Sequence, residues 1–387
     1  MDIYALKERF EQLETPFYYY DTDLLDRTID EAKRYAALIP AAEIHFAVKA
    51  NANPVILRHV RDAGFGADCV SGGEIERCLE VGIPANKIVY AGVGKTDREI
   101  RLGIERGILC FNVESLPEIE IIDQLAAEQQ KTARIALRIN PNIDAHTHKN
   151  ITTGLEENKF GISLDDMEKA VQAVMKAANL ELFGLHFHIG SQILEFDCFE
   201  ALSKKINELQ DLLESKGYPT LPSINVGGGL GVDYAQPEKH PVPDFESYFA
   251  TFAKHLKLRP GQSLHFELGR ALCAQCGSLI TRTILVKKTK TKQFAIVDAG
   301  FTDLIRPALY QAHHQIVNLS SRAPKETYDV VGPICESSDV FDTDIQLDAV
   351  SRGDLLALLS AGAYGFVMAS QYNCRRLPGE YTSEDFK

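Results

Sequence analysis

Short runs of apolar and β-branched residues alternate with segments of helical spacing through the first two thirds of the chain. Helical spacing is clearest over 52–62, 72–80 and 116–129. Strand–helix alternation at this spacing predicts parallel βαβ units. The eight predicted strands are 44–48, 65–70, 88–91, 108–113, 133–139, 182–189, 223–226 and 263–267.

Eight such units predict an α/β fold with a closed (β/α)8 TIM-type barrel over residues 24–268, and an open doubly wound sheet is the alternative. After about residue 270 the pattern changes to strands with few helices between them, which predicts a C-terminal antiparallel β domain. The segment 15–20 (TPFYYY) is also strand-like, and we expect it to join that sheet. The β domain is therefore predicted to comprise 1–23 and 269–387. Its main strands are predicted at 279–287, 293–298, 326–331 and 354–359.

Composition and charge narrow the class of protein. The chain has 387 residues and a formal net charge of -13, which disfavours nucleic acid and anionic membranes as partners. The first ten residues have no long apolar run, so no signal peptide is expected, and no apolar run reaches the roughly 18 residues of a membrane span. The eight cysteines are scattered, which favours reduced thiols in the cytoplasm over a disulfide framework.

Polar residues cluster just after the predicted barrel strands, where the active sites of such barrels lie. Lys49 follows an apolar strand in the sequence AVKAN. A buried lysine is costly unless it is neutralised or paired, and a covalent bond to an aldehyde cofactor neutralises it. From Lys49 alone, a surface lysine is the simpler interpretation. The strand-end residues are Lys49, Asp68, Ser71, Asn140, His186, His188, Ser191, Gly227, Gly228, Gly229 and Glu267.

His186 and His188 form an H-F-H pair, and the period of two along a strand predicts that both face the same side. Barrel hydrolases use such pairs to bind metal, but together with further histidines and an aspartate. The following Gly190, Ser191 and Gln192 suit contact with a phosphate or a ring better than metal binding. Ordinary histidines at the barrel mouth are the third interpretation, and no metal site is expected.

Glycines and a carboxylate end the last two barrel strands. The run Gly227–Gly231 (GGGLG) permits either an anion cradle or only a tight turn. Glu267 is able to pair with a pyridine nitrogen and keep it protonated, which makes the ring an electron sink. Arg270 is able to bind a carboxylate or a phosphate through two parallel hydrogen bonds. An ordinary surface salt bridge between these two residues is the alternative.

Two cysteine motifs lie in the predicted β domain. Cys335 stands in GPICESSD beside acidic residues, where it is a candidate proton donor, although a lone cysteine more often only packs. Cys273 and Cys276 form a single C-x-x-C without a second pair. We interpret these two as structural or incidental thiols and not as a zinc or redox site.

In their order along the chain, these motifs resemble the fold-type III pyridoxal phosphate (PLP) decarboxylases over nearly the whole length, which implies an alanine racemase-like fold. HIGSQ and GPICESSD are specific together, whereas GGGLG is not. Leu268 departs from the proline usual in the family's E-P-G-R motif, which implies a less rigid loop. The matching motifs are AVKAN (47–51), THKNITTG…KFGI (147–162), HFHIGSQ (186–192), GGGLG (227–231), ELGR (267–270), GPICESSD (332–339) and GAYG (362–365).

The resemblance implies a role for each matching residue. Lys49 binds the cofactor covalently, His188 stacks on its ring, Glu267 pairs with the ring nitrogen, and Cys335 donates a proton from the partner subunit. The implied phosphate-region residues are Ser191, Gly228, Gly229, Gly269, Arg270 and Tyr364. The implied substrate-binding residues are Arg270, Arg306, Tyr310, Glu336 and Tyr364.

The expected reaction is decarboxylation of meso-diaminopimelate to L-lysine and CO2 by a homodimer with shared active sites. Relatives acting on ornithine or arginine carry aspartate after the motif cysteine, and here the residue is Glu336. Glu336 suits the distal ammonium of the substrate, and Arg306 with Arg270 suits its distal carboxylate. The alternatives are decarboxylation of another basic amino acid or polyamine precursor, a PLP carrier without turnover, and a metal-dependent hydrolase using His186 and His188.

Overall fold

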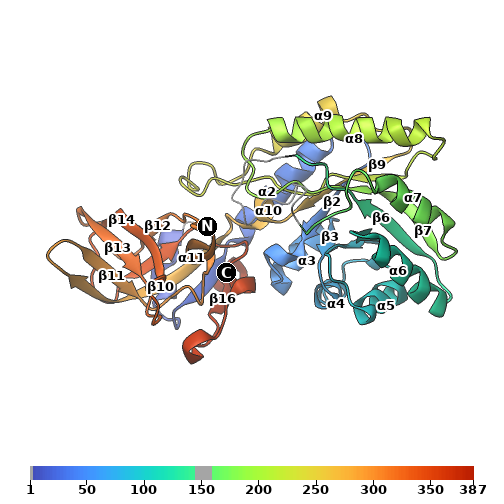
Figure 1. The fold of residues 1–387 in the computed structure, drawn as a ribbon. Helices are drawn as coiled ribbons and strands as arrows, with labels where there is room; N and C mark the ends of the chain where they lie inside the picture. Colours follow the sequence, from blue (N-terminus) through green and yellow to red (C-terminus); the bar gives the residue numbers. More distant parts are fainter. Residues whose placement is uncertain (1–2, 144–158) are drawn as a thin grey trace. The chain divides into compact units, whose positions relative to one another are not determined.

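The protein is described by a computed structural model that covers residues 3–143 and 159–387. The chain forms two compact units (Figure 1). The first unit consists of Met1–Thr28, Val232–Pro243 and Arg270–Lys387, and the second consists of Ile29–Gly231 and Asp244–Gly269. Residues 232–243, which fall inside the range 24–268 predicted for the barrel, thus group with the β-rich unit.

The second unit contains a closed barrel of parallel strands, as the alternation predicted. The barrel closes where β2 pairs in parallel with β9, from Ala42 beside Leu264 to Phe46 beside Leu268. The open-sheet alternative is therefore wrong. The barrel strands are β2 (Ala42–Ala47), β3 (Gly66–Cys69), β4 (Ile88–Tyr90), β5 (Cys110–Val113), β6 (Ala133–Arg138), β7 (Leu180–His186), β8 (Ser223–Asn225) and β9 (Ser263–Leu268).

After each of the first four barrel strands, the next α-helix begins at a capping residue a few positions beyond the strand end. Ser71 accepts a hydrogen bond from the Glu74 amide at the start of α4, and Thr96 forms a capping box with Glu99 at the start of α5. Such caps satisfy amides that the first helical turn leaves unpaired. The helices are α2 (Thr22–Ala36), α3 (Pro54–Asp62), α4 (Gly72–Glu80), α5 (Asp97–Arg106), α6 (Leu116–Glu128), α7 (Met167–Lys176), α8 (Asp197–Ser215) and α9 (Phe245–His255).

The first unit is built on a sheet in the order β12-β15-β10-β11-β13-β14, with β1 and β16 attached beside β10. β1 runs antiparallel to β10, which confirms that the N-terminal segment joins the C-terminal sheet. The strands are β1 (Phe17–Tyr20), β10 (Gly277–Lys288), β11 (Gln293–Val297), β12 (Ile316–Asn318), β13 (Lys325–Val331), β14 (Val340–Asp348), β15 (Leu355–Leu358) and β16 (Gly379–Thr382).

The prediction of a purely antiparallel β domain is wrong for two strand pairs. β1 pairs in parallel with β16, and β11 pairs in parallel with β13. The members of each pair are not joined by a hairpin, so local turn geometry does not impose an antiparallel direction.

Among the helices of residues 3–143 and 159–387, none has the length and apolar character of a membrane span.

Candidate active site

Lys49 lies in the short 3-10 turn Val48–Ala50, directly after β2. Its Nζ donates to Oδ2 of Asp68 on β3 at 3.0 Å. The Lys49 side chain is 36% exposed, whereas the Asp68 side chain is fully buried. Burial and then Glu267 raise the pKa of Asp68 to about 6, and Lys49 opposes both. Lys49 is therefore a paired cation at a strand end, which disfavours the surface-lysine interpretation.

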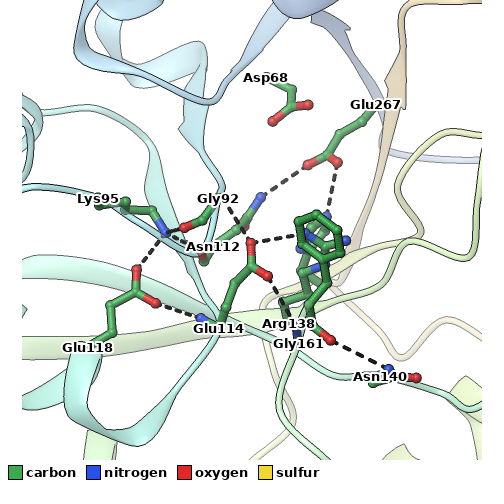
Figure 2. A network of polar contacts seen from close by, with 12 residues as sticks. Asp68, Gly92, Lys95, Asn112, Glu114, Glu118, Arg138, Asn140, Gly161 and Glu267 are labelled. Atoms are coloured by element: carbon green, nitrogen blue, oxygen red, sulfur yellow. Dashed lines mark hydrogen bonds and ion pairs between the residues drawn. The ribbon is translucent and has the colours of Figure 1, made fainter. Parts of the chain in front are cut away.

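Glu267 is a buried carboxylate on β9 that side chains from three other strands hold. Asn112 on β5 donates to Oε1 at 3.1 Å (Figure 2). Asn225 on β8 donates to the same oxygen at 2.8 Å, and His186 on β7 contacts Oε2 at 3.0 Å. Burial alone would raise the pKa of Glu267, but His186, followed by Lys49, outweighs burial and holds it below its ordinary value. The barrel interior thus presents an ionised carboxylate.

His186 and His188 serve different partners and do not form a metal pair. β7 ends at His186, and His188 lies two positions beyond it, so the prediction that both residues face the same side stays a prediction. Nδ1 of His188 accepts a hydrogen bond from the Gly228 amide at 3.2 Å. Burial, and then the charge of Arg138, lower the pKa of His188 well below its ordinary value, so the ring is neutral. Within residues 3–143 and 159–387, no three His, Cys, Asp or Glu side chains gather to hold a metal ion.

The glycines of the site lie where neighbouring backbone leaves no room for a side chain. A Cβ on Gly228 would lie 2.0 Å from the backbone oxygen of Glu267. Gly229 has a φ of +118°, and a Cβ on Gly269 would lie 3.0 Å from the Cβ of Ala47. Close packing thus requires these residues whether or not they also cradle an anion. Ser191 is half-buried in the loop that follows β7.

A second charged group in the barrel was not predicted from the sequence. Arg138 on β6 donates to Oε1 of Glu114 at 3.0 Å, and Glu114 also accepts from the amides of Gly92 and Gly161 (Figure 2). Lys95 is buried and paired with Glu118 at 2.5 Å. The only sequence pattern pointing to Arg138 is its place at the end of a predicted strand, where an apolar residue is usual.

The residues at the barrel mouth fit a pyridoxal ring. Lys49 offers an amine beside Asp68, Glu267 offers an ionised acceptor, and His188 offers a neutral aromatic face. Two buried atoms, Oδ1 of Asp68 and Nδ1 of His186, have no hydrogen-bond partner. Buried polar atoms rarely remain unpaired, so these two are open to a ligand.

In the β-rich unit, two buried arginines gather around one tyrosine. Arg270 begins α10 (Arg270–Cys273) and donates from Nη1 to the Tyr234 hydroxyl at 2.6 Å. Arg306 begins α11 (Arg306–Tyr310), and its guanidinium lies 4.6 Å from the Tyr234 ring centre. The Arg270 guanidinium also lies 4.9 Å from the Tyr364 ring centre. Three of the predicted residues are thus brought together, and Tyr234 is an unpredicted fourth.

The remaining predicted residues are more accessible. Cys335 and Glu336 are exposed, and the Tyr372 hydroxyl donates to Oε1 of Glu336 at 2.9 Å. Tyr310 is half-buried at the end of α11. All eight cysteines are free, including the buried Cys273 and Cys276. The part 147–158 of the THKNITTG…KFGI motif lies outside the described residues.

Three comparisons place the chain among known proteins. The family described as pyridoxal-dependent decarboxylase, pyridoxal binding domain, matches residues 25–274. Diaminopimelate decarboxylase of Bacteroides thetaiotaomicron is 60% identical over 98% of both chains. The enzyme of that name from Helicobacter pylori is 41% identical over 100% of this chain and 94% of its own.

Solved structures agree with the sequence matches. Crystalline diaminopimelate decarboxylase from Helicobacter pylori, complexed with L-lysine, superposes with a TM-score of 0.90 and 40% identity, over 98% of this chain and 94% of that one. Because family and fold agree over nearly the whole length, this chain belongs to the pyridoxal-dependent decarboxylase family, within the group of diaminopimelate decarboxylases.

Proposed function

We propose that this protein uses pyridoxal 5'-phosphate to decarboxylate meso-diaminopimelate, giving L-lysine and CO2 in the last step of lysine biosynthesis. The 60% identity to a diaminopimelate decarboxylase supports the substrate. The observation that carries the chemistry is the buried Glu267, held ionised by three side-chain donors. A structural salt bridge does not require an ionised carboxylate that three side chains hold in place. A protonated pyridine nitrogen does require an ionised carboxylate as its hydrogen-bond acceptor.

The barrel residues are assigned the cofactor. Bound pyridoxal phosphate supplies an electron sink for the electron pair that remains when CO2 leaves. Lys49 binds the cofactor covalently through Nζ, and Asp68 orients that amine. Glu267 accepts the ring N–H, and the neutral His188 stacks on the ring face. The residues assigned to the phosphate region are Ser191, Gly228, Gly229, Gly269, Arg270 and Tyr364.

Substrate recognition is assigned to charged and hydroxyl side chains. Arg306 and Arg270 bind the distal carboxylate, with Tyr310 and Tyr364 beside them. Glu336 binds the distal ammonium. Cys335 returns a proton from Sγ to the carbon that has lost CO2. The exposure of Cys335 and Glu336 supports the assignment of both to a partner subunit's site in a homodimer. The eight free thiols support a cytoplasmic location.

The function is tested with purified protein and added pyridoxal phosphate. With meso-diaminopimelate we expect equal amounts of CO2 and lysine, and ornithine and arginine should give little CO2. Turnover of ornithine or arginine in preference to diaminopimelate would favour another basic amino acid as the substrate. Absence of CO2 from all three would overturn the decarboxylase assignment.

The shared site is tested by mixing two inactive variants, Lys49→Ala and Cys335→Ala. A hybrid dimer would contain one doubly damaged site and one intact site. Random exchange makes about half the dimers hybrid, so about a quarter of wild-type activity should return. If no activity returns after a tagged pull-down shows subunit exchange, each chain completes its own site.

A further inference from the structure

Arg306 is bound by a histidine where a carboxylate would be the usual partner of a buried arginine. Its Nη1 lies 2.8 Å from Nε2 of His314, and both side chains are buried. Nδ1 of His314 lies 2.9 Å from the backbone oxygen of Leu359. Because a carbonyl only accepts, Nδ1 carries the hydrogen and Nε2 is left to accept from Arg306. The tautomer of His314 is therefore fixed by Leu359.

The His314 ring carries no charge at neutral pH. Burial, and then the charge of Arg306, lower its pKa to about 3. Arg306 also contacts Tyr234, through the ring face and a side-chain hydrogen bond, and its Nε has no hydrogen-bond partner. Among the described residues, the guanidinium of Arg306 therefore has only uncharged partners. A buried cation without a counter-charge is costly, and an anionic ligand would offset that cost.

The partner that fixes Arg306 is itself held in place. The Leu359 amide donates to the backbone oxygen of Gln315 at 2.9 Å. Leu359 therefore binds both His314, through its carbonyl, and the next residue, through its amide. The Tyr234 ring meets the His314 ring edge-on, with centres 5.2 Å apart. The direction of the Arg306 guanidinium therefore depends on His314.

We propose that His314 determines substrate specificity by giving Arg306 a neutral acceptor, which leaves the guanidinium charge available to a second carboxylate on the substrate. His314 is a positioning residue, because it acts through Arg306. An acid at position 314 would form a buried ion pair with Arg306 and compete with the carboxylate of the substrate. This inference rests on the proposed function and adds the reason for selecting a dicarboxylic amino acid.

The test compares two ligands that differ only in the distal carboxylate: L-lysine, the product, which keeps it, and cadaverine, the diamine that lacks it. The KM for meso-diaminopimelate and the inhibition constants of L-lysine and cadaverine are measured on the cofactor-loaded enzyme. In His314→Glu, we expect the KM for diaminopimelate to rise about tenfold or more, because the new acid occupies Arg306. The inhibition constant of lysine should rise with the KM, because lysine keeps the distal carboxylate. The kcat and the inhibition constant of cadaverine should stay within about threefold of wild type, since neither depends on that carboxylate.

Two further variants separate charge from packing and from distant electrostatics. His314→Gln keeps an uncharged acceptor for Arg306 and should raise KM less than about threefold. His313→Glu places the same charge one position away, on a half-exposed side chain that contacts Asp342, and should leave KM unchanged. His314→Asp carries the same charge on a shorter side chain and replaces His314→Glu if cofactor absorbance and melting temperature show that the latter does not fold.

The results distinguish a failure of the inference about His314 from a failure of the proposed function. Equal losses in His314→Glu and His314→Gln would show a packing role and overturn the inference. An unchanged KM in the folded acidic variant would also overturn it. If wild type releases no CO2 from diaminopimelate, the proposed function itself fails and the inference fails with it. If wild type decarboxylates diaminopimelate but binds cadaverine as tightly as lysine, the inference alone is overturned.

Discussion

The barrel and the β-rich unit each bury a polar cluster, and the two clusters balance their charges differently. In the barrel, Glu267 receives three side-chain donors, Asp68 pairs with Lys49, and Glu114 pairs with Arg138. In the β-rich unit, Arg306 has a neutral histidine and an aromatic face as its partners. The first cluster is compensated by the protein, and the second keeps an uncompensated positive charge.

This difference indicates what each cluster is able to do chemically. A compensated cluster holds its side chains rigidly and sets the electronic state of a bound ring without attracting net charge. An uncompensated buried arginine favours an anion, because the charge has already been removed from water during folding. Changes in the barrel should therefore abolish chemistry, whereas changes around the arginines should shift substrate preference.

The largest effect is expected for Lys49→Ala, which removes the covalent anchor. We predict a loss of at least about a thousandfold in kcat/KM. Without Lys49, the pKa of the buried Asp68 should rise further above about 6, so Asp68 becomes neutral and the barrel still folds. Enzyme kinetics and a thermal melt measure both outcomes. Lys87→Ala, which changes a half-buried lysine bonded to the Gly64 carbonyl, is the control. If Lys49→Ala keeps activity within tenfold of wild type, the role of Lys49 is refuted.

Glu267→Gln should have the next largest effect, about a hundredfold loss in kcat, because the ionised acceptor is lost while the shape is kept. The wild-type pKa of Glu267 lies below its ordinary value. Glu267 therefore stays ionised, and the wild-type rate should show no decline from this residue down to the ordinary glutamate pKa of about 4.3. A pH profile of kcat checks this, with the exposed Glu43→Gln as the control variant. An equal loss in both variants would contradict the role of Glu267.

Glu336→Asp tests the proposed contact between Glu336 and the distal ammonium of the substrate. Shortening the side chain by one methylene group withdraws the carboxylate from the distal ammonium and from the Tyr372 hydroxyl. We expect kcat/KM for diaminopimelate to fall about tenfold, equivalent to roughly 1.4 kcal/mol. Glu326→Asp, on the exposed part of β13, is the matched control. If kcat/KM stays unchanged, Glu336 does not bind the substrate.

The smallest effect on activity is expected for His45→Gln. Nε2 of His45 lies 2.8 Å from Nδ1 of His265, and burial lowers the pKa of the two rings to about 4 and about 3. Folding therefore excludes protons that the unfolded chain binds near pH 6.5. The stability from the neutral pair is complete above pH 6.5 and is lost as pH falls towards 4.

Activity of His45→Gln at neutral pH should stay within about twofold of wild type. The loss of stability between pH 6.5 and 4 should be shallower than in wild type, by up to about 1 kcal/mol per pH unit. Denaturant unfolding at several pH values measures the slope. An identical slope in both proteins would show that His45 does not titrate between the two states.

Helix and strand positions were predictable from the sequence because they depend on local periodicity. The helix predicted at 72–80 is the observed α4 (Gly72–Glu80), and the predicted strand 293–298 corresponds to β11 (Gln293–Val297). The strands β12 (Ile316–Asn318), β14 (Val340–Asp348) and β16 (Gly379–Thr382) were missed. β12 and β16 are too short to show an alternation, and β14 is rich in aspartate, which strands disfavour, so pairing with other strands decides their conformation.

The positions of Lys49 and Glu267 at strand ends follow from the order of apolar and polar residues alone, and parallel strands bring such ends to one face of a barrel. Which side chains meet at that face depends on the folded chain. Asn112 reaches Glu267 from 155 positions away, and that contact depends on the stagger of all eight strands, which no local pattern records. The neutral partner of Arg306 was hidden for the same reason: the tautomer of His314 is set by the backbone oxygen of Leu359, 45 positions further along the chain.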